Sequence, residues 1–393
     1  MGLDAGYGIG SLKPGVCTSS TRPASPYNGQ VIYMTDVAQT AVWDGTQWTV
    51  LAPISSGRNV VINGAMQVHQ RGTSTASITT SGYYTADRFQ FDNATLGTWT
   101  QTSENDAPTG SGFRKSLKVL CTTADASPAS IDYLAIRHRM EGQNLQQFLK
   151  GTASAKQFAL SFWVKSNVTG TYVVGLEDVD NSRLIGLTYS ISASATWEKK
   201  TIIFPADTTG TINNDNEQSL LINFWLAVGS NGNSTTLQTT WGAANYSNGT
   251  YATGQTNLAA ATNNYWQITG VQLEAGAVAT PFEFEDYGTT LEKCKRYYFR
   301  HIDPVATGVS NGGPVRMLLP FHTQMRVVPT TGISGTMNYY NGAGTTTGTT
   351  INASYNTINH AQLDMNATIG SNGHAVVMYS TGGSQYLDFS AEL

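Results

Sequence analysis

Acidic side chains are the first candidates for chemistry in this sequence. Glu177, Asp178 and Asp180 lie in the segment LEDVDNSR, and Asp215 and Glu217 lie in NNDNE. Two carboxyl groups, one protonated and one ionised, can cleave a glycosidic bond. Both segments are, however, typical of hairpin turns, where Asp and Asn side chains hydrogen-bond to their own backbone. We interpret them as turns and keep Glu177, Asp178 and Asp180 as the alternative, a glycan-hydrolase site.

Other catalytic arrangements are missing from the sequence. It has no Gly-x-Ser-x-Gly motif, and its six histidines lie in unrelated contexts. Cys17, Cys121 and Cys294 are far apart and match neither a zinc spacing nor a secreted disulfide framework. They favour free thiols in a chain made in a reducing cytosol. We therefore predict a protein that is not an enzyme, with no catalytic residue, bound metal or cofactor.

Aromatic side chains in loops suggest a different chemistry, the binding of sugars. Sugar sites use aromatic rings as platforms and a few polar groups to fix orientation. Trp241, Tyr246 and Tyr251 lie in a long polar loop without secondary-structure periodicity, and such loops are often functional. Tyr339 and Tyr340 are further candidates in the C-terminal part of the chain. We predict that these five residues contribute to glycan binding.

Two arginines add polar candidates. Arg137 and Arg139 flank His138 in AIRHRMEG, and this cluster could hold a sugar hydroxyl, although His138 is also typical of an ordinary strand residue. Tyr355 is a further candidate aromatic. Trp225 flanks the inward-facing residues of its strand, so we interpret it as part of the core.

The composition favours an all-β protein. Only 12% of the residues are charged while 40% are hydrophobic, and the chain contains 40 glycines and 19 tyrosines. Aromatic and β-branched residues fit pleated surfaces, and glycine and asparagine fit turns. The net charge of −4 is spread without long runs, which argues against nucleic acid or an anionic membrane as a partner. No signal peptide or membrane-spanning apolar run is found, so we predict no membrane insertion.

Short strand patterns separated by turn signals fill the middle of the chain and predict a two-sheet sandwich. Phe158, Leu160, Phe162 and Val164 alternate cleanly, as do Leu220, Ile222, Phe224 and Leu226, and both sets are expected in the core. The expected strands are Asn59 to Val68, Asp87 to Asp92, Ser116 to Thr122, Ile131 to Met140, Gln157 to Ser166, Thr171 to Asp178, Leu184 to Ile191, Trp197 to Phe204, Leu220 to Val228 and Tyr265 to Leu273.

The flanking regions are also expected to be β. Near the N-terminus, Gln30 to Asp36 and Ala41 to Leu51 read as short strands, with a hairpin turn at Asp44-Gly45. Helical spacing occurs in Gln143 to Lys150 and in Thr289 to Arg300. The C-terminal strands are expected at Val315 to Phe321, Thr336 to Tyr340, Thr349 to Tyr355, Ala361 to Met365, His374 to Tyr379 and Tyr386 to Glu392, with a turn at Asn341 to Gly348. We divide the chain into an N-terminal segment with a β-hairpin module (1–52), a central two-sheet sandwich (53–287, beginning with a linker) and a C-terminal β-sandwich (288–393); the family resemblance described next implies that the first is an attachment segment and the second a jelly roll.

Four segments carry a family resemblance. They are INGAMQVHQRGTS with TADRFQF, LSFWVKS, TWEKKTIIFPAD, and ITGVQLEAGAVATPFEFEDYG followed by LEKCKRYY. In this order they resemble a family of bacteriophage and prophage tail-fibre proteins that contain a jelly-roll domain like a carbohydrate-binding module. RPASPYNGQVIYMTD with VWDGTQW resembles a small N-terminal β module of phage fibres, and PFHTQMRVVPT resembles a segment of the family's C-terminal β-domain.

The resemblance implies a function. A member of this family is expected in the virion, as a homotrimeric tail fibre joined through its N-terminal segment to other virion proteins. It is expected to attach to host-surface polysaccharide without cleaving it. The alternatives are a capsid-decoration, tail or baseplate fibre without a receptor role and, less favoured, a glycan-degrading tailspike. The resemblance also suggests a structural calcium, but the expected acidic ligand is replaced by Ile268-Thr269-Gly270-Val271, which argues against the metal.

Overall fold

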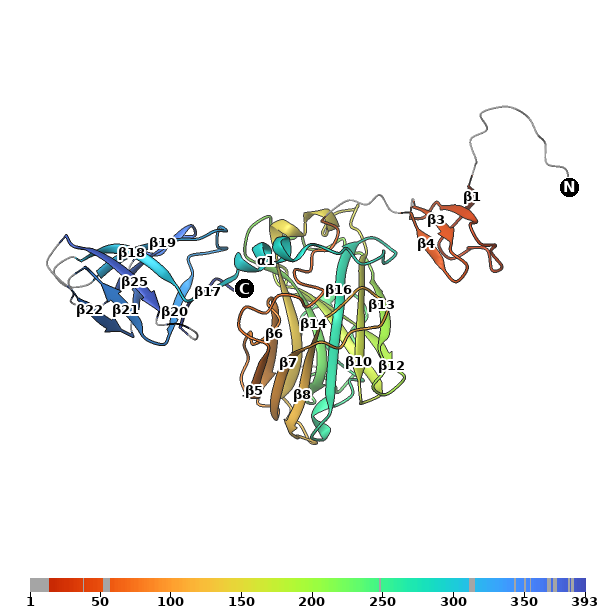
Figure 1. Ribbon diagram of the computed structural model, residues 1–393. Helices are drawn as coiled ribbons and strands as arrows, with labels where there is room; N and C mark the ends of the chain where they lie inside the picture. Colours follow the sequence, from red (N-terminus) through yellow and green to blue (C-terminus); the bar gives the residue numbers. More distant parts are fainter. Residues whose placement is uncertain are drawn as a thin grey trace, which may run out of the picture.

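Three β-rich bodies follow one another along the chain (Figure 1). A computed structural model describes residues 14–37, 39–51, 57–246, 249–310, 315–342, 344–349, 351–353, 355–365, 369, 373–380, 382 and 385–393. Residues 1–13 of the predicted attachment segment and residues 53–56 of the predicted linker (53–57) lie outside these residues. Within the described residues the fold is all-β apart from one α-helix and three short 3-10 turns.

The N-terminal body is a four-stranded sheet in the order β1-β2-β3-β4. The predicted turn at Asp44-Gly45 is confirmed, because the Asp44 carboxylate accepts hydrogen bonds from the backbone N–H of Thr46 at 2.8 Å and of Gln47 at 2.9 Å. A small cluster around Ile32 and Met34 forms its core. The strands are β1 (Gly15–Cys17), β2 (Val31–Met34), β3 (Gln39–Trp43) and β4 (Trp48–Val50).

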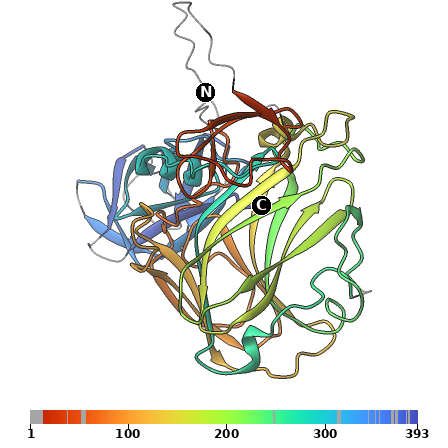
Figure 2. The same ribbon diagram turned by 90° about the vertical axis from the view of Figure 1, so that its right-hand side faces the viewer.

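The central body is the predicted jelly-roll sandwich of two six-stranded sheets, which lie face to face in Figures 1 and 2. The first sheet has the order β13-β10-β16-β8-β7-β5 and the second the order β15-β12-β11-β14-β9-β6. The strands are β5 (Ser74–Ile78), β6 (Phe89–Ala94), β7 (Thr98–Glu104), β8 (Ser116–Thr123), β9 (Tyr133–Glu141), β10 (Phe158–Ser166), β11 (Gly170–Asp178), β12 (Arg183–Ile191), β13 (Glu198–Phe204), β14 (Gln218–Val228), β15 (Gly242–Ala243) and β16 (Tyr265–Ala275).

The predicted inward faces form the core between the two sheets. Phe158, Leu160, Phe162 and Val164 are fully buried there, and so are Leu220, Ile222, Phe224 and Leu226. Because side chains alternate along a strand, the residues between these positions point to the outer faces of the sandwich. On β9 and β14 those outward residues include Arg137, Arg139 and Trp225.

The strand predicted at Asn59 to Val68 is wrong. Asn63 and Met66 have positive φ angles of 62° and 56°, which are incompatible with an extended strand. The segment follows β16 only at a few points: Val60 N–H donates to Leu273 O, and Val271 N–H donates to Gly64 O, both at 3.0 Å. This irregular pairing is matched by Gly270 of β16, whose φ is +63° where the register with β10 shifts. Strands β5 and β7 were not predicted because Ser and Thr weaken their hydrophobic alternation, and the two-residue β15 lies in the segment expected to be a loop.

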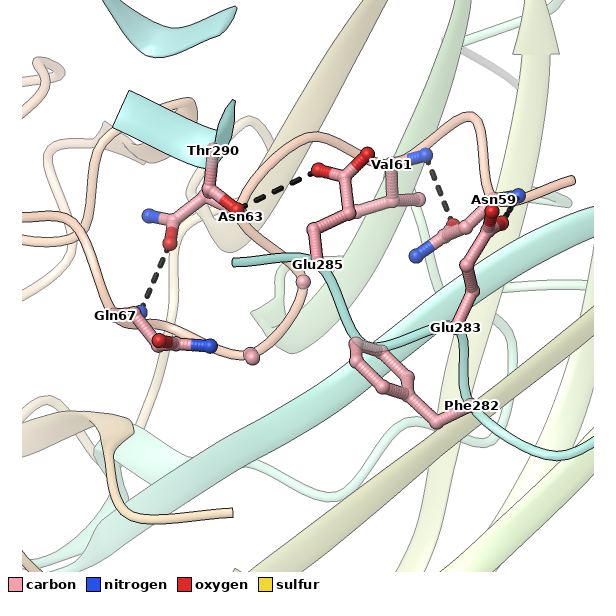
Figure 3. Close-up of a pocket in the computed structure, with 10 residues that line it drawn as sticks. Asn59, Val61, Asn63, Gln67, Phe282, Glu283, Glu285 and Thr290 are labelled. Atoms are coloured by element: carbon pink, nitrogen blue, oxygen red, sulfur yellow. Dashed lines mark hydrogen bonds between the residues drawn. The ribbon is translucent and has the colours of Figure 1, made fainter. Parts of the chain in front are cut away.

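The segments that enter and leave the central body meet at one end of it, as Figure 3 shows for Asn59, Val61 and Asn63 beside Phe282, Glu283 and Glu285. The Glu283 carboxylate accepts hydrogen bonds from Gly57 N–H at 2.6 Å and from Asn59 N–H at 2.8 Å. The hollow between the segments measures about 20 Å³, enough for one water molecule. The entry and exit of the central body are therefore bound to each other.

Both predicted helices differ from the observed elements. Helix α1 (Tyr287–Lys295) begins at the N-cap Asp286 and ends before Arg300, because β17 (Tyr298–Ile302) already begins in the predicted helix and pairs with β26 (Tyr386–Ser390). The aromatic run Tyr297-Tyr298-Phe299 explains the change, since aromatic residues favour strands. The helix expected at Gln143 to Lys150 is replaced by two 3-10 turns, η1 (Gly142–Asn144) and η2 (Gln146–Phe148). A third 3-10 turn, η3 (Leu258–Ala260), precedes β16.

The C-terminal body has a three-stranded sheet, β17-β26-β20, and a seven-stranded sheet, β22-β21-β25-β18-β19-β24-β23, around a second apolar core. Strands β17, β18 and β20 were not predicted, and the turn expected at Asn341 to Gly348 contains β22, which pairs with β21. The remaining strands are β18 (Val305–Ser310), β19 (Val315–Pro320), β20 (Thr330–Ser334), β21 (Met337–Tyr340), β22 (Thr345–Gly348), β23 (Ile351–Ala353), β24 (His360–Met365) and β25 (Ala375–Ser380).

Charged contacts join the C-terminal body to the central body. Glu392 forms ion pairs with Arg88 and, at 3.1 Å, with Arg71. Arg296 binds Glu141 through two hydrogen bonds of 2.8 Å. Arg88 is fully buried, and its guanidinium also stacks 3.5 Å above the Tyr297 ring.

Cys17, Cys121 and Cys294 are free thiols. In the described ranges no helix combines the length and the apolar character needed to cross a bilayer.

Candidate functional site

A cleft of about 440 Å³ lies on the outer face of the sheet that contains β9, β11 and β14. Aromatic, charged and amide side chains converge in it. Its lining residues are Ile131, Tyr133, Arg137, Arg139, Glu177, Gln218, Leu221, Trp225, Asn231, Tyr246 and Tyr251.

The strand register explains why these residues meet. Glu177 on β11 lies opposite Leu221 on β14, and Leu221 lies opposite Arg139 on β9. In the next outward-facing row Asn223 lies between Gly175 and Arg137. The sheet therefore brings a carboxylate, an amide and two guanidinium groups to one surface, although they come from three separate strands.

An aromatic wall borders these polar rows. The ring of Trp225 contacts Tyr133 with centroids 5.8 Å apart and Tyr251 with centroids 4.7 Å apart. Tyr246 continues the row, 5.3 Å from Tyr251. Trp225 and Tyr251 are nearly buried, whereas Tyr246 is 40% exposed, so Tyr246 presents the accessible ring.

The two arginines are held differently. Arg137 forms an ion pair with Asp92 and lies near the rings of Tyr133 and Trp225. Arg139 Nε donates to Gln90 Oε1 at 3.0 Å, and its Nη1 donates to Gln218 Oε1. The charge of Arg137 is thus neutralised inside the protein, whereas Arg139 is oriented by neutral amides.

Glu177 faces the arginines across the cleft. Its Oε2 accepts a hydrogen bond of 3.4 Å from Asn223 Nδ2. Burial and the neighbouring Glu177 carboxylate raise the pKa of Tyr246 well above its usual value, so this phenol remains a hydrogen-bond donor at neutral pH. Asn223 Oδ1 is buried and has no hydrogen-bond partner in the described part of the chain. The cleft can therefore both accept and donate hydrogen bonds beside exposed ring surface.

The structure brings together four of the seven predicted glycan-binding residues: Arg137, Arg139, Tyr246 and Tyr251. Trp241 lies elsewhere: its ring packs against Phe158, and its Nε1–H donates to Pro205 O at 2.8 Å.

The C-terminal candidates lie outside the cleft. Tyr339 is fully buried in the C-terminal core, whereas Tyr340 is exposed on that body. Tyr355 is exposed there as well.

The predicted alternative site of acidic residues is split by the fold. Glu177 points into the cleft, but Asp178 is buried on the opposite side of β11 in an ion pair with Lys150. Asp180 accepts a hydrogen bond from Asn213 N–H at 2.9 Å, and Asp215 accepts one from Glu217 N–H at 3.0 Å. His138 is buried in the core, where burial lowers its pKa to about 3.

Tyr133 and Trp225 line the cleft but were not among the predicted glycan-binding residues, and Glu177 was considered only for the hydrolase alternative. Trp225 is 2% exposed, yet it lies on the outer face of the sheet in a small cluster covered by Tyr251. The alternation of β14 contained the signal, because Leu221, Asn223 and Trp225 are out of phase with the inward set. Among the described residues no group of three or more His, Cys, Asp or Glu side chains could hold a metal ion.

Comparisons with known proteins find solved structures of low similarity. No family model and no curated protein matches the sequence, so the tail-fibre family remains a resemblance. The chain is similar to the enzymatically active domain of tailspike protein 4 from bacteriophage CBA120, at 14% identity and a TM-score of 0.30, over 56% of this chain and 21% of that one. It is also similar to a family 4 carbohydrate-binding module, at 9% identity and a TM-score of 0.28, over 55% and 99% of the two chains.

A third similar structure is the family 11 module of the cellulase Lic26A-Cel5E from Clostridium thermocellum, at 12% identity and a TM-score of 0.26, over 52% and 96% of the two chains. The chain thus spans about a fifth of the tailspike structure and nearly all of each of the two modules.

Proposed function

We propose that this protein binds glycans in the cleft on the outer face of its central sandwich. The observation that carries this proposal is the convergence of the partly exposed Tyr246 ring with Arg139, Glu177 and Asn231 in one cleft. A ring offers an apolar face to the C–H groups of a sugar, while amide, carboxylate and guanidinium groups bind its hydroxyls.

We further propose that the protein binds glycans without cleaving them. Glycosidases generally require two carboxyl groups that flank the scissile bond. Of the carboxylates considered from the sequence, only Glu177 lines the cleft, and its sequence neighbour Asp178 is buried against Lys150. The chemistry of the cleft therefore supports binding better than hydrolysis.

The biological setting of the proposal comes from the sequence resemblance. We propose a virion fibre protein, assembled as a homotrimer, that attaches to host-surface polysaccharide and is joined to other virion proteins through its N-terminal part. Several weak sites in one particle multiply the overall affinity. The second candidate is a structural fibre without a receptor role, and electron microscopy of the particle together with binding measurements distinguishes the two.

A glycan array probed with the full chain tests the binding proposal. The Tyr246→Ala variant is expected to lose at least tenfold in affinity for the glycans bound by the unmodified chain, because it removes the accessible ring. Tyr355→Ala is the matched control, since Tyr355 is 67% exposed on the C-terminal body. Equal binding by both variants and the unmodified chain contradicts the cleft as the site, and the steady release of shorter oligosaccharides contradicts binding without cleavage.

A further inference from the structure

Arg139 carries a charge that the protein holds in place but does not neutralise. A guanidinium has five N–H donors, and Arg139 uses two of them on the side-chain oxygens of Gln90 and Gln218. These amides fix the plane of the group without contributing negative charge. In the described part of the chain, Nη2 of Arg139 donates to no acceptor and no carboxylate forms an ion pair with this residue.

The acidic residues on β9 and on its neighbour β6 are already paired. Asp92 binds Arg137, and Glu141 binds Arg296. Arg88 donates a hydrogen bond to the backbone carbonyl of Arg139, and its ion-pair partner is Glu392. Glu392 also forms an ion pair with Arg71. None of these carboxylates is available to Arg139 without breaking an existing pair.

The opposite side of the cleft is suited to a different group. Glu177 and Arg139 belong to one cross-strand row with Leu221 between them, so their backbones lie about 10 Å apart, two strand spacings. Glu177 accepts one hydrogen bond, from Asn223 Nδ2, and an ionised carboxylate has room for further donors. The row therefore offers a cation, Arg139, at one end and a hydrogen-bond acceptor for hydroxyl groups, Glu177, at the other.

Resting on the proposed function, we propose that the cleft selects acidic polysaccharides and binds the carboxylate of one sugar at Arg139. A neighbouring neutral sugar packs on Tyr246 and donates a hydroxyl hydrogen bond to Glu177. Guanidinium and carboxylate are matched in shape and charge, and hydrogen bonds between ionised partners are about twice as strong as neutral ones. Arg139 is thus a specificity-determining residue, whereas the aromatic wall supplies affinity for sugars in general.

Carboxyl reduction of the ligand provides the test. The full chain is applied to an array of bacterial polysaccharides that carry uronate or sialate, that carry phosphate, or that are neutral. The strongest carboxylate-bearing binder is then compared with the same polymer after its carboxylates have been reduced to alcohols. The unmodified chain is expected to bind the native polymer at least tenfold more tightly, and added NaCl is expected to weaken only that binding.

Two substitutions locate the effect. Arg139→Gln is expected to remove both the preference for the native polymer and its salt dependence, while Arg139→Lys retains part of the preference because the charge remains. Arg114→Gln is the matched control, since Arg114 is an exposed arginine on the loop after β7. Unchanged circular dichroism and thermal melting exclude misfolding as the cause.

The outcomes separate this inference from the proposed function. If neutral glycans bind best and Tyr246→Ala abolishes that binding, glycan binding stands and acid selection is overturned. Preference for phosphate-bearing polymers alone also overturns the carboxylate assignment. If Arg139→Gln weakens native and reduced polymers equally, Arg139 has only a structural role. If no polysaccharide binds, the proposed function itself fails.

Discussion

At the scale of single residues, some charged groups in this protein form ion pairs within the fold, whereas others keep hydrogen-bond donors free for a ligand. Arg137 and Arg139 are two positions apart on β9 and share an outer face, yet Asp92 pairs only with Arg137. From the sequence the two are equivalent candidates. Their difference depends on Asp92, Gln90 and Gln218, which come from β6 and β14, and no local pattern reveals which strands lie next to β9.

Asp87 illustrates how burial changes a residue's response to pH. Its carboxylate accepts hydrogen bonds from Gln70 and lies 3.7 Å from Arg71, but burial dominates and raises its pKa to about 6. In the unfolded chain the pKa is close to 3.8. Between these values the folded protein retains a proton that the unfolded chain has lost, so the free energy of unfolding falls as the pH rises.

This difference in pKa predicts that the unfolding free energy depends measurably on pH. Between pH 4.5 and 7.5 the unmodified protein is expected to lose about 2 kcal/mol more unfolding free energy than the Asp87→Asn variant, which cannot titrate. Urea unfolding at both pH values measures the loss for each protein. The comparison uses the change with pH, because the variant also alters the contact with Gln70. Parallel curves for the two proteins would contradict the raised pKa.

At the scale of elements, strands with strong alternation were predicted correctly and irregular or polar ones were not. β10 and β14 have continuous apolar inward faces, and both were predicted to within a few residues. β5 has the sequence STASI and lies at a sheet edge, where little apolar burial is required, so its pattern is weak. The helix expected to reach Arg300 stops early because β17 gains backbone partners on β26, a contact between residues far apart in sequence.

The irregular segment beside β16 depends on a close backbone approach at Gly64. A Cβ atom at this position would lie 2.0 Å from Val271 O, so any side chain pushes the segment away from β16. We expect Gly64→Ala to lower the unfolding free energy by about 2–4 kcal/mol, in the range of overpacked or strained buried sites. Gly344→Ala is the control, because a Cβ there faces open space. Similar denaturant midpoints for both variants would show that the segment can shift freely.

At the scale of the whole molecule, buried charge couples the C-terminal body to the central one. Arg88 is completely buried, and its counter-ion, Glu392, comes from the far end of the sequence. Removing one member of a buried pair leaves an uncompensated charge and typically costs about 3–5 kcal/mol. The two bodies are therefore expected to unfold in one coupled transition while this pair is intact.

Differential scanning calorimetry of Glu392→Ala checks the coupling. We expect the variant to unfold in two separated steps, with the C-terminal body melting first. Glu285→Ala is the control, since its partner Lys293 is 41% exposed and surface pairs contribute only about 0–1 kcal/mol. The double variant Arg88→Met, Glu392→Leu, which removes both charges, is expected to recover part of the loss. A single unshifted transition in Glu392→Ala would contradict the role of this pair.

The hydrogen bonds from Glu283 to Gly57 and Asn59 have a mechanical consequence for a chain anchored at one end and pulled at the other. Figure 1 shows the other two bodies on either side of the sandwich, near the end that carries α1, the helix that follows Glu283 in the chain. A stretching force is then transmitted through the Glu283 hydrogen bonds from the entry segment to the exit segment. The strands of the sandwich carry little of this force while these bonds are intact. In optical-tweezer pulling, Glu283→Gln should rupture at lower force than the unmodified chain, and the sandwich should extend only after the bridge has given way.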